Sequence, residues 1–379
     1  MINFQPFSPV EIQFSSKSSA AEIVKNWCKQ SGTTLLLASQ GRANDLGIAD
    51  WIRENTVKFD IVHVDKIPSN PSVEDLCAML CDMKNVTIAN MIAVGGGSCI
   101  DLAKAISALH FLSLDHHITT EWVSKAIMQK AYLKNQSVID ILAVPTTSGT
   151  GSEVTKWATI WDMKVKSKLS IDAVSLYPKM ALMVPELTIS LNRRLTLSTG
   201  LDALSHAMEA FWAKSRTPLS QALALNAISQ VKKYLPLAIQ DGNNLMARQG
   251  MSVASLLAGL SFSITRTTAC HSISYPLTML YGIEHGFAAA LSLTSVAKHN
   301  IIEVPEIYRI YEIFGGEKAF KLWIMQLCYP IVSLNMGYFG VLPEQLDEIV
   351  EKTFTQGRMD NNPVAFTKEQ VKEILTEIL

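Results

Sequence analysis

The sequence predicts an α/β nucleotide-binding domain with a parallel sheet over residues 1–185, followed by an all-helical domain over residues 186–379. In the first half, short apolar runs alternate with helical stretches about every 30 residues, which is typical of strand–helix–strand connections in a parallel sheet. After residue 185, segments rich in Ala, Leu, Ser and Met show helical periodicity without a further strand pattern. A chain of 379 residues is also long enough for about two domains.

Each expected element follows from its local pattern. In the first domain, apolar runs that end in polar or glycine-rich residues predict buried strands over 33–38, 59–64, 88–96 and 138–145. Between them, apolar residues at helical spacing predict helices over 72–84 and 98–110. The same spacing in the second domain predicts helices over 201–213, 218–236, 244–262 and 286–300. The change in character places the domain boundary near 185–190.

Composition limits the classes of function. Charged residues make up 18% of the chain, below the roughly 25% typical of soluble domains, which fits large buried surfaces or an oligomer interface. The net charge of −1 offers no basic excess for a nucleic acid or an anionic membrane. The N-terminus lacks a signal-peptide pattern, and no apolar run reaches the ~18 residues needed to span a bilayer. We therefore expect a cytoplasmic homodimer without nucleic-acid or membrane partners.

The spacing of the six cysteines does not predict a disulfide framework. None of them has a paired CxxC spacing, and the chain is long for so few cysteines. Cys77 and Cys81 lie four residues apart on a predicted helix, where they are most simply reduced thiols.

The segment VGGGSCIDLAK (94–104) runs from an apolar strand through Gly95, Gly96, Gly97 and Ser98 into a helix. Glycines let the backbone approach a ligand closely, and the free N–H groups at a helix start attract phosphate. The alternative is a plain strand-to-helix turn, for which one glycine would suffice. The pattern is not the GxGxxG fingerprint. It predicts a site for the phosphates of a nucleotide or dinucleotide.

A second polar loop, PTTSGTGSEVT (145–155), also follows directly after an apolar strand. Open α/β sheets bind ligands at the carboxyl ends of their strands. The segment therefore predicts a second ligand-binding loop at that edge, with an ordinary polar loop as the alternative.

In the helical domain, Asp202 and His206 lie four residues apart in STGLDALSHAMEAFW (198–212), so their side chains share one helix face. Alone, the pair could be a capping aspartate with an unrelated histidine. His271 and His285 stand fourteen residues apart in apolar surroundings, where a single histidine is usually a core residue. One carboxylate and three imidazoles together suit Fe(II) or Zn(II), with a position left for a substrate oxygen. The other five histidines are expected in surface or packing roles.

The order of these motifs resembles that of the iron-containing (group III) alcohol dehydrogenase family, over nearly the whole chain. SNPS (69–72) looks like that family's loop after the second strand, GGGSCIDLAK like its pyrophosphate loop and TTSGTGSEVT like its nicotinamide-side loop. The closing segment 358–375 is also similar to family C-termini. The resemblance implies metal ligation by Asp202, His206, His271 and His285. It implies cofactor contacts at Ser39, Asn70, Gly95, Gly96, Gly97, Ser98, Asp101, Thr146, Thr147, Ser152 and Lys168.

Three positions depart from the family pattern. Many members carry an Asp after the first strand that favours NAD over NADP; here the stretch is LLLASQGR, with Ser39 at that place and Arg42 nearby, so both NAD(H) and NADP(H) remain open. Val184 stands where the family usually has an Asp before the PEL segment, and nothing in the sequence explains this change. Tyr275 stands where many members have a His four residues after the first late ligand. The surrounding TRTTACHSISYPLT is similar to the branch that contains phosphonoacetaldehyde reductases.

The resemblance implies reversible hydride transfer between NAD(P)H and a small aldehyde, with the metal as a Lewis acid and the cofactor in a cleft between the domains. Tyr275 is predicted as a proton relay, with a packing role as the alternative. Arg266, beside the hydroxyls of Thr267 and Thr268, is predicted to bind an anionic aldehyde such as phosphonoacetaldehyde; an exposed helix-end arginine is the alternative. Three other functions remain open: a dehydroquinate synthase-like lyase, an alcohol dehydrogenase without anionic preference, and a non-catalytic metal- and nucleotide-binding protein.

Overall fold

The computed structural model describes residues 8–30, 32–134, 137–354 and 357–379, which divide into two compact units. The first unit comprises Met1–Thr147 and Ser152–Thr188, and the second comprises Ser148–Gly151 and Ile189–Leu379, within the described ranges. The sequence predicts a boundary at 185/186, with each domain formed by one continuous segment of the chain. In the structure the boundary lies three residues later, and four residues of the second polar loop belong to the helical unit.

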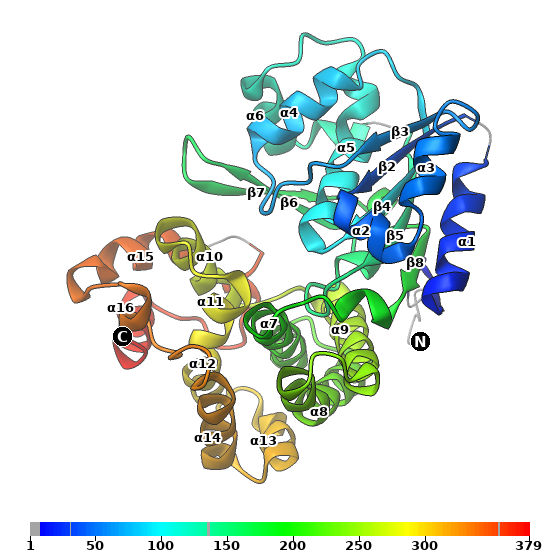
Figure 1. Cartoon of the computed structure of the whole chain (residues 1–379). Helices are drawn as coiled ribbons and strands as arrows, with labels where there is room; N and C mark the ends of the chain where they lie inside the picture. Colours follow the sequence, from blue (N-terminus) through cyan, green and yellow to red (C-terminus); the bar gives the residue numbers. More distant parts are fainter. Residues whose placement is uncertain (1–7, 31, 135–136, 355–356) are drawn as a thin grey trace, which may run out of the picture. The chain divides into compact units, whose positions relative to one another are not determined.

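The first unit contains a six-stranded parallel sheet in the order β1-β8-β5-β4-β2-β3 (Figure 1). Its strands are β1 (Glu11–Phe14), β2 (Thr33–Ala38), β3 (Ile61–Val64), β4 (Ile88–Gly95), β5 (Asp140–Pro145) and β8 (Met180–Met183). All four predicted runs are strands, and the predicted α/β fold with a parallel sheet is confirmed. An antiparallel hairpin, β6 (Trp157–Asp162) and β7 (Ser167–Asp172), forms a separate two-stranded sheet.

Side chains alternate between the two faces of the sheet, as the period of a strand requires. Leu35 and Leu37 of β2 point into one buried cluster with residues of α4, α5 and α6, whereas Leu36 and Ala38 point into another with residues of α1, α2 and α3. Helices therefore cover both faces, which explains why these strands read as continuous apolar runs. The helices of this unit are α1 (Lys17–Cys28), α2 (Gln40–Leu46), α3 (Ala49–Asn55), α4 (Val73–Asp82), α5 (Gly97–Ser113) and α6 (Thr120–Met128).

The described residues of the second unit, apart from loops and short 3₁₀ turns, are helical. Its helices are α7 (Arg193–Trp212), α8 (Pro218–Gln240), α9 (Leu245–Thr265), α10 (Ala269–Tyr281), α11 (His285–Leu291), α12 (Leu293–Asn300), α13 (Tyr308–Phe314), α14 (Glu317–Cys328), α15 (Leu346–Thr353) and α16 (Lys368–Glu377). The single helix predicted over 286–300 is two helices, α11 and α12, which meet at Ser292. One hydrophobic cluster forms the core of this unit, and α7 is buried over most of its length.

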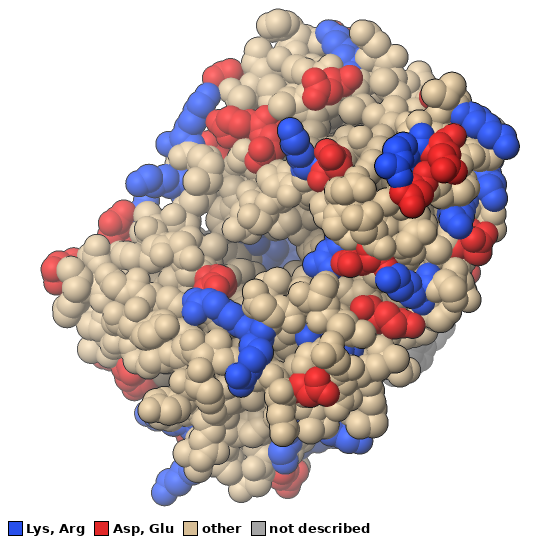
Figure 2. All heavy atoms as spheres, in the orientation of Figure 1, with Lys and Arg blue, Asp and Glu red and all other residues tan. Residues whose placement is uncertain are grey.

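Three further findings bear on the composition. All six cysteines are free thiols, as expected. No helix among the described residues is long and apolar enough to cross a bilayer. On the face drawn in Figure 2, acidic and basic side chains are interspersed among a larger area of other residues, in line with the low content of charge.

Candidate active site

Most of the residues predicted to bind the cofactor follow the carboxyl ends of four neighbouring strands, β3, β2, β4 and β5. Ser39 follows β2, Gly95 ends β4, and Thr146 follows β5; Asn70 lies in the loop after β3. The chain reverses its direction across the sheet between β2 and β4, which is the switch point where open α/β sheets bind ligands. The structure therefore brings these residues to one edge of the sheet.

The glycine loop leads directly into α5, whose N-cap is Gly96 and has no side-chain cap hydrogen bond. A Cβ at Gly96 would lie 3.2 Å from Cγ2 of Thr147, so the loop and the following polar segment approach closely. The Asn70 backbone N–H donates to Oγ of Ser98 at 3.1 Å, and Asn70 adopts a left-handed φ of 53° that Asn tolerates. The uncapped N–H groups at the start of α5 suit a phosphate oxygen.

Asp101 and Ser152 are brought together, but they bond to one another. The Ser152 hydroxyl donates to Oδ1 of Asp101 at 2.5 Å, and the Thr159 backbone N–H donates to Oδ2 at 2.9 Å. The fully buried ammonium of Lys104 donates to the Ser152 carbonyl at 2.6 Å and to the Trp157 carbonyl at 3.0 Å. This network ties α5 to the segment that follows the second polar loop.

Ser39 and Arg42 lie in local hydrogen-bonded positions. The Ser39 hydroxyl caps α2 by accepting the Arg42 backbone N–H at 3.4 Å. The Arg42 guanidinium donates to Asp45 at 3.1 Å and to the Leu187 carbonyl at 3.4 Å. Lys168 is half-buried on β7, opposite Trp161 of β6.

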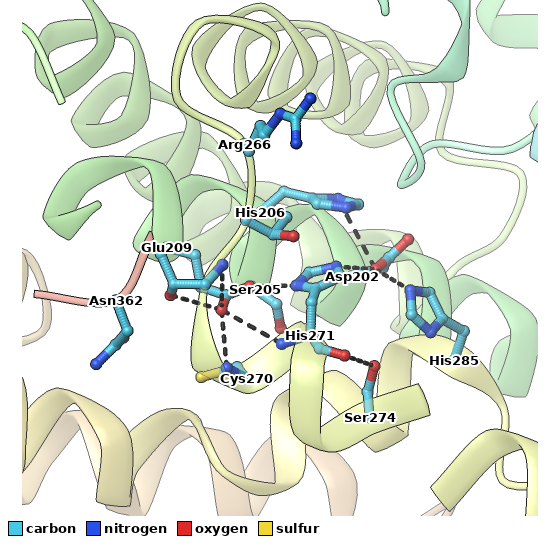
Figure 3. Close-up of polar contacts among 12 residues, drawn as sticks. Asp202, Ser205, His206, Glu209, Arg266, Cys270, His271, Ser274, His285 and Asn362 are labelled. Atoms are coloured by element: carbon cyan, nitrogen blue, oxygen red, sulfur yellow. Dashed lines mark hydrogen bonds and ion pairs between the residues drawn. The ribbon is translucent and has the colours of Figure 1, made fainter. Parts of the chain in front are cut away.

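In the helical unit, the four predicted metal ligands come from three helices (Figure 3). Asp202 and His206 lie on α7, His271 is in the first turn of α10, and His285 begins α11. Oδ1 of Asp202 lies 3.7 Å from Nε2 of His271 and 3.9 Å from Nε2 of His285. Potential ligand atoms of these three residues lie within 4.8 Å of one another.

His206 lies beside this group of three. Its ring stacks on the rings of His271 and Phe262, with centroid distances of 4.4 and 4.2 Å. Nδ1 of His206 is 3.2 Å from the Gly149 carbonyl, and if Nδ1 carries the hydrogen, Nε2 is left as an acceptor. Gly149 packs against the backbone of Thr199 on α7, where any Cβ would clash. Residues 148–151 of the second polar loop thus hold His206 in place.

A close helix contact and an ion pair fix His285. Any Cβ at Gly286 would clash with the Ser198 carbonyl, so only glycine allows α11 to lie this close to α7. Glu284, the N-cap residue of α11, accepts two hydrogen bonds from Arg194 at 2.5 and 2.7 Å. The close approach of α11 to α7 brings the His285 side chain near Asp202.

The electrostatics fit a cation. Burial raises the pKa of Asp202, but the interactions of this carboxylate with the three histidines outweigh that effect and hold the pKa below its usual range. Burial lowers the pKa of His206 to about 4, which keeps this imidazole neutral. Oδ1 of Asp202 and Nε2 of His271 are buried polar atoms without a hydrogen bond among the described residues. Buried polar atoms rarely stay unpaired, and a carboxylate with imidazoles is a donor set that suits Fe(II) or Zn(II).

The residues predicted to act on the substrate have mixed surroundings. The Tyr275 ring stacks on His285 with a centroid distance of 6.1 Å. Arg266 ends α9 with a φ of 63° and is half-buried. Oγ1 of Thr267 is buried without a hydrogen bond among the described residues, whereas the Thr268 hydroxyl donates to Glu209. Only the first of the two threonine hydroxyls is therefore left for a ligand.

Sequence reasoning missed Glu209, a fully buried carboxylate that hydrogen-bonds to His271. The signal was present in the spacing, because Asp202, His206 and Glu209 recur at i, i+4 and i+7 on one face of α7. A second carboxylate on the helix face that carries Asp202 and His206 would have pointed to it.

Comparisons with known proteins give one family. The family profile "Iron-containing alcohol dehydrogenase" matches residues 11–185, and "Fe-containing alcohol dehydrogenase family, C-terminal" matches residues 196–379. The 1,3-propanediol dehydrogenase of Klebsiella pneumoniae is 32% identical over 386 aligned positions, which cover 95% of each chain. The choline dehydrogenase of Bacillus subtilis (strain 168) is 31% identical over 333 positions, covering 84% of this chain and 81% of the relative.

A solved structure extends the similarity to three dimensions. The sulfoacetaldehyde reductase from Bifidobacterium kashiwanohense in complex with NAD+ superimposes with a TM-score of 0.83 at 27% identity, covering 100% of this chain and 99% of that one. The family profiles together match most of the chain, and relatives of at least 30% identity span it. The resemblance predicted from the motifs is confirmed, and the chain belongs to the iron-containing alcohol dehydrogenase family.

Proposed function

We propose that this enzyme interconverts a small aldehyde and a primary alcohol with NAD(H) or NADP(H), and that it prefers an aldehyde bearing an anionic group. The observation that carries the proposal is the meeting of Asp202, His271 and His285, with two buried polar atoms left without a hydrogen bond. In the reducing direction, a hydride from NAD(P)H and a proton convert the aldehyde to the alcohol and NAD(P)+.

The metal is held by Asp202, His206, His271 and His285, with Fe(II) as the native ion and Zn(II) as the alternative. A divalent cation bound there supplies Lewis acidity toward the substrate oxygen. The proton is exchanged at the Tyr275 hydroxyl, whose ring is 7% exposed and stacked on His285. The ring contact supports this assignment, because His285 is one of the four predicted metal ligands.

The dinucleotide is held by the first unit. The uncapped start of α5 at Gly96 and Gly97 binds the pyrophosphate, with Ser98 and Asn70 beside it. Thr146 and Thr147 contribute from the second loop, and Oγ1 of Thr146 is buried without a hydrogen bond among the described residues. The internal bond between Asp101 and Ser152 shapes this loop.

Arg266 supports the preference for an anionic substrate. Its backbone lies in the left-handed region, which costs roughly 1–3 kcal/mol for a non-glycine residue and is typical of functional positions. The Asn361 amide holds this segment by donating to the carbonyls of Thr265 and Thr267 at 2.7 and 3.1 Å. Thr267 follows Arg266 directly in the chain, and a guanidinium together with a hydroxyl suits a phosphonate, sulfonate or carboxylate. The sulfoacetaldehyde reductase among the structural relatives has a name that fits this substrate class.

The experiment uses protein loaded anaerobically with Fe(II), NADH or NADPH, and a panel of phosphonoacetaldehyde, sulfoacetaldehyde and neutral aldehydes of similar length. We expect stoichiometric consumption of the reduced cofactor and a kcat/KM for an anionic aldehyde about 10- to 100-fold above that for the neutral ones. Turnover without net consumption of cofactor would favour a lyase. Equal or better turnover of neutral aldehydes would leave a general alcohol dehydrogenase.

Arg266→Ala tests the anion site directly. It is expected to abolish the preference for the anionic aldehyde and to leave the metal content unchanged. Arg309→Ala is the matched control, because Arg309 is an exposed arginine of the same unit on α13 and its loss changes the net charge equally. An unchanged ratio of kcat/KM values in Arg266→Ala would remove Arg266 from the substrate site.

A further inference from the structure

Glu209 lies at the centre of a buried hydrogen-bond network on α7 (Figure 3). Oε1 accepts from the Thr268 backbone N–H at 2.9 Å, the Thr268 hydroxyl at 2.7 Å, the Cys270 N–H at 2.8 Å and the His271 N–H at 3.3 Å. Oε2 is hydrogen-bonded to Nδ1 of His271. Five donors therefore converge on one carboxylate that is completely buried.

Two of these backbone donors belong to the first turn of α10, and a third belongs to its N-cap residue, Thr268, which makes no side-chain cap of its own. The first N–H groups of a helix have no partner within the helix, and an acidic group stabilises this end of the helix dipole. Glu209 thus supplies the cap from another helix. The bonds to the N–H groups and to His271 offset the burial of its charge, and they hold the pKa of Glu209 below its usual value although burial acts to raise it.

We propose that Glu209 is a positioning residue for the metal centre, because it bonds Nδ1 of His271 while Nε2 of the same ring faces Oδ1 of Asp202. This inference rests on the proposed function. A carboxylate that accepts the Nδ1–H of a histidine fixes its tautomer and ring orientation, so that the lone pair of Nε2 is available to a cation. Nε2 of His271 has no hydrogen bond among the described residues, and it lies 3.7 Å from Oδ1 of Asp202.

Glu209→Gln separates this role from capping. Four donors converge on the position of Oε1, so the amide oxygen is expected there and the amide NH₂ then faces Nδ1 of His271. An NH₂ donor favours the tautomer with hydrogen on Nε2, where the cation binds. The helix cap keeps its acceptor, whereas the imidazole presents the wrong nitrogen.

Thr268→Val is the matched control. It removes the Thr268 hydroxyl, which donates to Glu209 and accepts from the Trp212 indole at 2.9 Å, but it leaves the bond between Glu209 and His271 intact. Both variants lower the thermal midpoint of the metal-free protein if the network stabilises α10. Only Glu209→Gln is expected to change the metal site itself.

The probe is Co(II), with its dissociation constant measured by chelator competition and its site followed by visible absorption. We expect the dissociation constant to rise roughly 10- to 100-fold in Glu209→Gln with an altered spectrum, and to change less than about threefold in Thr268→Val. The dissociation constant for NADH reports whether the first unit is intact, and it is expected to stay unchanged in both variants. Wild-type affinity and an unchanged spectrum in Glu209→Gln would reduce Glu209 to a helix cap.

His271→Ala distinguishes failure of this inference from failure of the proposed function. If His271→Ala binds Co(II) as tightly as the wild type, the metal centre is wrong and the role of Glu209 is wrong with it. If His271→Ala loses Co(II) while Glu209→Gln keeps it, only the role of Glu209 is wrong. Should Glu209→Gln not fold, Glu209→Asp replaces it, because the shorter side chain keeps its charge but withdraws from Nδ1. A roughly tenfold loss of Co(II) affinity is then expected, and wild-type affinity would overturn the inference.

Discussion

The side chain at position 39 is expected to control the choice between NAD and NADP. Its hydroxyl already caps α2, and both Asp and Asn are good N-cap residues, so either can replace it without loss of the helix start. If Ser39 faces the 2′ position of the cofactor, as the sequence predicts, Ser39→Asp places a negative charge beside a 2′-phosphate. We expect it to raise the dissociation constant for NADPH at least tenfold more than that for NADH.

Ser39→Asn is the neutral control for this substitution. It has nearly the size of Asp but no charge, so it should change the two dissociation constants by similar factors. Titration of both variants with NADH and NADPH measures the difference. If Asp and Asn have the same effect on NADPH, Ser39 does not lie near the 2′ position of the bound cofactor.

At this scale the sequence predicted which residues meet better than it predicted their surroundings. Asp202, His271 and His285 were predicted from residue type and spacing, and the structure brings them together. The sequence could not distinguish the hydroxyls of Thr267 and Thr268, because the hydrogen bond from Thr268 to Glu209 depends on the packing of α10 against α7. The role of Glu209 depends on contacts 59 to 62 residues apart, which no local pattern encodes.

At the scale of elements, α5 and the segment 152–157 are joined by Lys104. Its ammonium donates to the Ser152 carbonyl and hydroxyl and to the Trp157 carbonyl, and burial lowers its pKa to about 8 although Asp101 and Glu153 act to raise it. A buried lysine is retained only where its hydrogen bonds compensate for lost hydration. These hydrogen bonds keep residues 152–157 against α5, the helix that begins at the predicted phosphate site.

Lys104→Met is expected to lower the free energy of unfolding by about 3 kcal/mol, because it leaves buried carbonyls without donors. It should also weaken NADH binding, since the loop after β5 loses its anchor. Lys125→Met on α6 is the control, because Lys125 is exposed and its substitution removes the same charge. Denaturant titration and NADH titration measure the two effects, and equal behaviour of the two variants would contradict the role given to Lys104.

The strands that escaped prediction are short or lie outside the buried centre of the main sheet. β1 and β8 have four residues each and form one side of the sheet, where β1 is exposed at both ends and gives no apolar run. The hairpin of β6 and β7 alternates polar and apolar residues, a weaker signal than the buried central strands. The four residues 148–151 belong to the helical unit because Gly149 and Gly151 pack against α7 and α9, a long-range contact that their polar composition does not reveal.

At the scale of the whole molecule, each unit has a hydrophobic core of its own. Two clusters lie on the two faces of the sheet, and a third lies among the helices of the second unit. The predicted cofactor residues all belong to the first unit, and the predicted metal ligands all belong to the second. The order of motifs along the chain was enough to predict this separation of the two sets of residues, although the second polar loop contributes its residues 148–151 to the second unit.

Calorimetry of the metal-free protein is therefore expected to show two unfolding transitions, one for each core. A ligand at about 100 times its dissociation constant stabilises the unit that binds it by about 2.7 kcal/mol, which corresponds to roughly 5 to 10 °C for a unit of this size. Co(II) should raise one transition and NADH the other, and His271→Ala should cancel only the shift caused by Co(II). If both ligands raise the same transition in the wild type, metal and cofactor residues belong to one cooperative unit, and the assignment of separate tasks to separate cores is wrong.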